Sequence, residues 1–158
     1  MAHPVHPGGY IHGCNMTCSR AVIDQIGGFD ATFGAGAAFR AGEDTDFIYR
    51  GWAAGIPVEY VPDMSVKHFH GRRDVRSVMR LHWNYQFGNG ALYAKHVGRR
   101  PSLLKHLYWA ARNAGREMLG GQRFDEEIGL TWRSMFVANL CGFLAYSYQS
   151  IQAALMIP

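Results

Sequence analysis

The clearest hydrophobic pattern lies in the second half of the chain, where apolar side chains recur every four residues at Val75, Met79, Trp83, Phe87 and Ala91. Residues at this spacing share one face of a helix, so the pattern predicts a long helix that begins near Arg72. Breaks at Gly98–Pro101 and Gly120–Gly121 then divide the remaining chain. They leave a second helix, capped by Ser102 and ending near Leu119, and a third from Asp125 to near Leu155.

The first half of the chain mixes helical and strand-like patterns. Ser19 is a good N-cap for a short helix over 20–26, which Gly27–Gly28 would end, and a second helix is expected over 47–54. Strands are expected at 10–18, 57–61 and 64–70. The sequence therefore predicts an α/β domain over residues 1–71, followed by a helical, basic and amphipathic extension over 72–158.

The last predicted helix carries no charged residue after Arg133, and the uncharged stretch is long enough to span a bilayer. Its polar side chains make a transmembrane segment the weaker interpretation. They are Asn139, Ser147, Gln149, Ser150 and Gln152. A helix that packs in the core or lies at a membrane interface is expected instead.

Charge is distributed unevenly along the chain. Residues 67–116 hold eleven Lys or Arg and one acid, Asp74, whereas residues 1–66 hold three Arg and seven acids. A basic segment of this kind favours an anionic partner such as phosphate, pyrophosphate or an anionic membrane surface. No nucleic-acid-binding motif is visible, so nucleic acid is not an expected partner.

Three cysteines, Cys14, Cys18 and Cys141, do not make a disulfide framework, and residues 1–13 do not resemble a signal peptide. A cytoplasmic protein is therefore expected, with peripheral attachment to the inner face of the cell membrane as an option. His12, Cys14 and Cys18 could suggest zinc, but the Cys-x₃-Cys spacing is poor for a structural site and favours small buried cysteines.

Three acids crowd together at Glu43, Asp44 and Asp46, just before the second predicted helix. Helical spacing places Asp44 on the face that the helix would bury, and places Asp46 four residues before Arg50, which suits a surface ion pair. Acids also favour the first turn of any helix because the helix dipole stabilises them there. The cluster alone leaves a structural and a functional interpretation open.

Two histidines, His68 and His70, end the last predicted strand and alternate onto one face. Imidazoles placed in this way can bind a divalent metal, or one can bind the metal while the other contacts a substrate. A lone His-x-His is also compatible with no metal at all.

Taken in order, several short motifs resemble the second half of family 2 glycosyltransferases of the GT-A fold. They are Gly13-Cys14-Asn15-Met16, Ser19-Arg20, Ile26-Gly27-Gly28-Phe29-Asp30, the run from Phe33 to Asp46, Tyr60-Val61-Pro62-Asp63, Val66 to His70, and Tyr85-Gln86-Phe87-Gly88-Asn89-Gly90. The resemblance covers about residues 10–100. It implies a partial GT-A fold that lacks the nucleotide-binding half, followed by a helical region.

The resemblance implies an inverting transfer of sugar from a nucleotide-sugar donor to a hydroxyl of a glycan or lipid-linked acceptor. The family's Glu-Asp pair falls on Glu43 and Asp44, with Asp44 as the general base that takes the proton of the acceptor hydroxyl. The family's late histidine, which helps to hold a divalent Mn or Mg ion or the donor pyrophosphate, falls on His68, with His70 as its neighbour. Residues expected to contact substrate are Asn15, Arg40, Asp46, Arg72 and Arg73. For the arginines, a solvated basic face is an equally good interpretation.

The sequence departs from the family because the half that ends in an Asp-x-Asp metal motif is missing. The chain could therefore be a fragment, a half that works with a separate donor-binding chain, or a remnant. A non-catalytic accessory or interaction module is the main alternative to an enzyme. A metal-dependent hydrolase is a third possibility that only the ligand types support.

Overall fold

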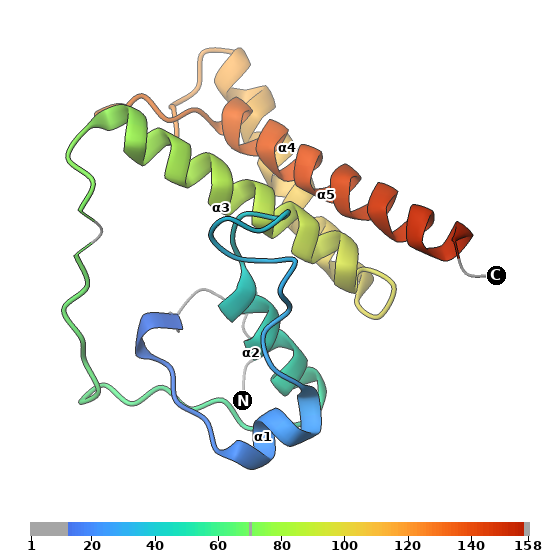
Figure 1. Cartoon of the computed structure of the whole chain (residues 1–158). Helices are drawn as coiled ribbons and strands as arrows, with labels where there is room; N and C mark the ends of the chain where they lie inside the picture. Colours follow the sequence, from blue (N-terminus) through green and yellow to red (C-terminus); the bar gives the residue numbers. More distant parts are fainter. Residues whose placement is uncertain (1–12, 70, 157–158) are drawn as a thin grey trace.

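The chain folds into helices joined by turns and extended segments, and the computed structural model describes residues 13–69 and 71–156 (Figure 1). Helices make up 59% of the described residues, and no sheet forms among them. The elements in chain order are η1 (Gly13–Asn15), α1 (Arg20–Ile26), α2 (Glu43–Ala53), α3 (Val75–His96), η2 (Pro101–Leu103), α4 (Leu104–Met118) and α5 (Trp132–Leu155).

The predicted α/β GT-A fold is therefore wrong, although the helical C-terminal region is confirmed. Residues 57–61 and 64–69 are extended but pair with no neighbouring strand, and a turn at Pro62–Asp63 separates them. Residues 13–15 of the first expected strand form a 3₁₀ turn. An alternating pattern makes a strand only where a second strand accepts its backbone hydrogen bonds, and the described part of the chain supplies none.

The boundaries of the helices follow the local sequence more closely than the predicted strands do. Helix α1 spans the predicted residues, and Gly27 ends it with φ of 78° while its N–H bonds the Ile23 carbonyl at 2.8 Å. Helix α3 begins after Asp74, whose carboxylate accepts a hydrogen bond from the Ser77 N–H at 2.8 Å. Helix α5 begins at Trp132, later than predicted, because residues 124–131 form a turn closed by a bridge between Asp125 and Leu130.

Helices α3, α4 and α5 pack together in one group, with α1 and α2 beneath α3 (Figure 1). The α3–α5 contact brings the two backbones together: a Cβ on Gly142 would lie 1.8 Å from the Phe87 carbonyl oxygen, and one on Gly90 would lie 1.9 Å from that of Asn139. Glycine at these positions is what permits the close approach. None of the helices in the described residues is long and apolar enough to cross a membrane.

The core lies where the loop before α2 meets α3 and α5. Its buried members are Phe33, Phe39, Tyr49, Ala91, Leu92, Tyr93 and Leu103. Tyr146 of α5 lies beside both Phe33 and Phe39, with ring centroids 6.2 and 5.1 Å away. The small-residue loop over 29–42 is thus anchored by aromatic side chains, and it fixes where α2 begins.

Candidate active site

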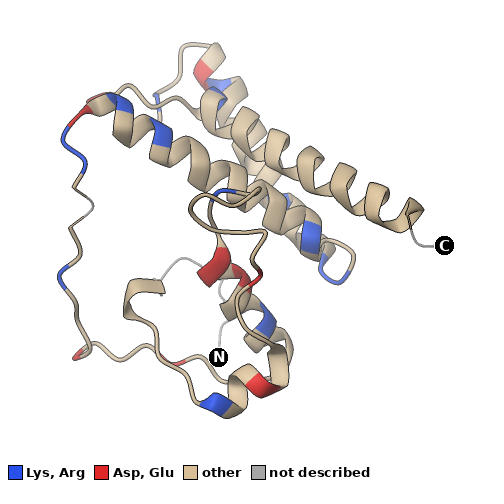
Figure 2. Cartoon of the chain, viewed as in Figure 1, with Lys and Arg blue, Asp and Glu red and all other residues tan. Residues whose placement is uncertain are grey.

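The candidate site is built on the first turn of α2. Gly42, the N-cap, has φ of 94°, a left-handed conformation that favours glycine. A Cβ on Gly88 of α3 would lie 2.4 Å from the Ala41 carbonyl oxygen, so the backbone before α2 rests directly on α3. Figure 2 shows the resulting position of the acidic first turn of α2, against the middle of α3.

Asp44 is half-buried, and its carboxylate is held by three donors. Oδ2 accepts from the Gly13 N–H at 2.8 Å, and Oδ1 accepts from the Thr45 N–H at 2.7 Å and the Thr45 hydroxyl at 3.3 Å. A Cβ on Gly13 would lie 3.0 Å from the Asp44 Cβ, so the absence of a side chain there permits the contact. Each carboxylate oxygen has two lone pairs, which leaves Asp44 able to accept a further hydrogen bond.

Glu43 and Tyr85 complete the site beside Asp44. The Glu43 side chain faces Gly34, where a Cβ would lie 3.3 Å from Glu43 Cδ. Burial raises the pKa of the Tyr85 hydroxyl, Arg72 opposes this, and the negative charges of Asp44 and Glu43 raise it further. Tyr85 is 41% exposed, so the group opens to solvent. Two carboxylates, a phenol and a guanidinium therefore lie near enough to act on one another electrostatically.

Asp46 has a different environment from the one predicted. Its side chain is fully buried, so the expected ion pair with Arg50 forms but is not on the surface: Nε lies 2.8 Å from Oδ2. Lys95 Nζ at 2.7 Å and His96 Nε2 at 2.8 Å approach Oδ1 from α3. Burial alone would raise the pKa of Asp46, but hydrogen bonds from His96, Lys95 and Arg50 together hold it well below its usual range. This enclosure leaves the carboxylate no surface for a substrate.

The other residues expected to contact substrate have different contacts in the structure. The Asn15 amide donates to the Met64 carbonyl at 2.8 Å and so holds the extended segment. The guanidinium of Arg40 stacks on the Phe87 ring, 4.5 Å from its centroid. Arg72 lies near enough to Tyr85 to lower the pKa of its hydroxyl, and Arg73 is exposed in the segment before α3.

The metal site predicted at His68 and His70 stays a prediction, because one of its two histidines lies outside the described residues. His68 is exposed on the extended segment, and His70 lies outside the described residues. Across 13–69 and 71–156, no three His, Cys, Asp or Glu side chains gather in a way that could hold a metal ion. The cysteines differ from expectation, because all three are exposed.

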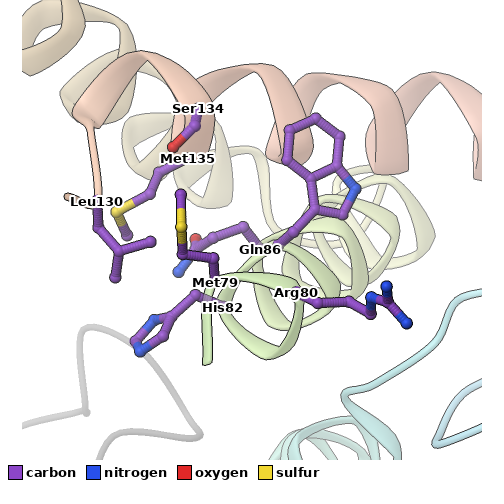
Figure 3. Close-up of a pocket in the computed structure, with 8 residues that line it drawn as sticks. Met79, Arg80, His82, Gln86, Leu130, Ser134 and Met135 are labelled. Carbon is purple, nitrogen blue, oxygen red and sulfur yellow. The ribbon is translucent and has the colours of Figure 1, made fainter. Parts of the chain in front are cut away.

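A separate cavity of about 250 Å³ lies between α3 and the start of α5 (Figure 3). Its lining is mainly apolar: Met79, Arg80, His82, Trp83, Gln86, Leu130, Ser134 and Met135. In Figure 3 the side chains of Met79, Leu130 and Met135 gather on one side. None of the residues predicted to bind substrate or metal lines this cavity, so it is distinct from the site on α2.

Sequence reasoning missed Tyr85 and Gly88 as parts of the site, although both lie in the Tyr85–Gly90 motif that carries part of the resemblance. Their position in that motif was the available signal. Comparison with known proteins adds no assignment: no family model matches the chain, and no curated protein or solved structure matches it significantly.

Proposed function

We propose that the chain supplies the acceptor-activating carboxylates of an inverting sugar transfer. The observation that supports this most directly is the environment of Asp44. Its carboxylate is oriented by Gly13 and Thr45, is half-exposed, and lies with Glu43 and Tyr85 at one surface. An oriented and accessible carboxylate is what a general base for a hydroxyl requires.

In the proposed reaction the acceptor hydroxyl attacks the anomeric carbon of a nucleotide sugar. Its proton passes to the Asp44 carboxylate as the new carbon–oxygen bond forms. The bond between that carbon and the diphosphate oxygen breaks, and its electron pair leaves with the nucleoside diphosphate. Glu43 and the Tyr85 hydroxyl are placed to hydrogen-bond the acceptor, and Arg72 is the nearby cation for developing negative charge.

The test couples two measurements on the full chain. Saccharide binding is followed by the amide NMR resonances of α2, and nucleoside diphosphate release is followed with a panel of nucleotide sugars, with and without a separate donor-binding chain. Asp44→Asn should lower transfer by about 10²–10⁴-fold and leave saccharide binding intact, because the amide cannot take the proton. Asp24→Asn, an exposed acid of α1, is the matched control and should change neither quantity. Transfer that is unchanged in Asp44→Asn would rule out the base assignment.

A second candidate function is a non-catalytic interaction module, and the extended segment favours it. Residues 59–69 are exposed throughout, and Phe69 reaches 86%. The segment's exposed apolar side chains are Tyr60, Val61, Met64, Val66 and Phe69. An extended apolar segment can add to the sheet edge of another chain. In that case Asp44→Asn would leave partner binding intact, whereas Val66→Asp would remove it.

A further inference from the structure

Helix α4 presents a face that combines apolar, aromatic and cationic side chains. Its inner face is apolar: Ala114 is buried and Leu107 packs against the core, beside the buried Leu103 of η2. Two adjacent rows at four-residue spacing lie on the opposite face. They contain Leu104, Tyr108, Arg112 and Arg116 in one row, and Lys105 and Trp109 in the other.

The exposed apolar members of this face, which we call the α4 face, are large. Tyr108 is 60% exposed and Trp109 is 50% exposed, and Leu119, just beyond the end of the helix, is 90% exposed. The Arg112 guanidinium lies 5.1 Å from the centroid of the Trp109 ring. Aromatic rings beside cations, on a helix whose other face is buried in protein, are typical of a helix that rests at a membrane surface.

The charge of the α4 face decides between possible occupants. Lys105, Arg112 and Arg116 are its charged residues, whereas the acid of this helix, Glu117, is turned inward. The Glu117 side chain is 5% exposed and accepts a hydrogen bond from the Arg133 N–H at 3.1 Å. A second copy of the chain would bring a like-charged face against this one, which is unfavourable, whereas an anionic surface complements it.

We propose that the α4 face binds the surface of a bilayer that contains anionic lipid. The cations contact the lipid phosphates while Leu104, Tyr108, Trp109 and Leu119 enter the boundary between headgroups and acyl chains. This proposal is independent of the sugar transfer proposed above. It narrows the expected membrane contact from the basic segment 67–116 and the uncharged α5 to one face of α4.

The test uses co-sedimentation of the full chain with vesicles of phosphatidylcholine alone or with 30% phosphatidylglycerol. The triple variant Lys105→Gln, Arg112→Gln, Arg116→Gln should bind the anionic vesicles about 100-fold more weakly, since each basic residue near such a surface contributes about fivefold. The control variant Arg20→Gln, Lys67→Gln, Arg76→Gln removes the same net charge from other elements and should bind as the unchanged chain does. Circular dichroism checks that both variants are folded.

A second readout locates the contact. Lipids brominated near the headgroup should quench tryptophan fluorescence in the unchanged chain, and Trp109→Phe should remove most of that quenching while the chain still sediments with vesicles. Equal binding by the two triple variants, binding that ignores the anionic fraction, or quenching that survives Trp109→Phe would each overturn the proposal. Self-association of the chain without vesicles that the α4 triple variant abolishes would assign the face to a second copy instead.

Discussion

The contacts of the buried Asp46 carboxylate allow us to predict how much stability the chain loses when its charge is removed. Its carboxylate is fully enclosed and meets Arg50 of the same helix together with Lys95 and His96 of α3. Removing one partner from a buried charged group typically costs about 3–5 kcal/mol, because the remaining charges stay desolvated. The Asp46→Asn variant keeps the shape of the side chain and removes the charge.

The loss of stability in Asp46→Asn is reduced because Lys95 and Arg50 keep other hydrogen-bond acceptors. Lys95 still lies 2.7 Å from Asp30, and Arg50 still donates to the carbonyl oxygens of Ile26 and Gly28. We therefore expect a loss near the lower end, about 3 kcal/mol, which is a large part of the 5–15 kcal/mol typical of a domain. The melting temperature should fall by about 6–12 °C for a chain of this size.

The pH dependence of the same variant tests the cause. Because the folded state lowers the pKa of Asp46 below its ordinary 3.8, the stabilisation is fully present above that value and is lost as pH falls below it. The difference in free energy of unfolding between the unchanged chain and Asp46→Asn should be constant near neutral pH and should shrink below about pH 4. Urea unfolding followed by circular dichroism at several pH values measures it.

The control is Asp24→Asn, which removes an acid whose pair with Arg20 is exposed to solvent and should change stability little. A loss below about 1 kcal/mol in Asp46→Asn at neutral pH would refute the assignment of Asp46 as a structural anchor. A difference that stays the same from pH 6 down to pH 2.5 would refute the electrostatic explanation.

Two further predictions concern packing and the extended segment. Gly142→Ala places a Cβ 1.8 Å from the Phe87 carbonyl oxygen, so thermal unfolding should show a loss of stability of about 1–3 kcal/mol. The control Gly115→Ala, whose Cβ would meet nothing within 4 Å, should be neutral or stabilising. Equal effects of the two variants would contradict the packing argument. Asn15→Ala removes the hydrogen bond to the Met64 carbonyl and should speed tryptic cleavage after Lys67 by about 2–10-fold. An unchanged cleavage rate would show that this bond does not restrain the extended segment 59–69.

The fold could be predicted from sequence where local chemistry decides it. The stop at Gly27 and the four-residue repeat from Val75 to Ala91 each fix an element within a few residues of its predicted bounds, and Ser19 stands at the N-cap of α1 although its side chain makes no capping hydrogen bond. The strands failed because a strand also needs a partner, which may lie anywhere in the sequence. The alternating residues 64–69 satisfy the local pattern of a strand but remain extended and exposed.

Only the part of the candidate site that depends on local sequence could be predicted. Glu43 and Asp44 lie at the start of a helix, as their positions indicated, and the structure places them together. Tyr85 lies near enough to them for their charges to raise its pKa, and Gly88 lets α3 contact the backbone before α2, a tertiary contact that no spacing in the sequence encodes. The surface placement of Asp46 was wrong because α2 is enclosed on more than one side: Phe47 and Ile48 are buried as their spacing indicated, but Asp46 is buried too.

Asp44 and Asp46 are two residues apart on one helix and therefore point to nearly opposite sides of it. The buried one ties α2 to Lys95 and His96, and this attachment also holds the first turn of the helix, with Asp44 and Glu43, beside Tyr85. The two acids should then be separable by experiment. Loss of the Asp46 charge should weaken stability and saccharide binding together, because the carboxylates lose their support. Asp44→Asn gives up one backbone hydrogen bond at the half-exposed start of α2, so it should cost less stability than Asp46→Asn, keep saccharide binding and remove proton transfer.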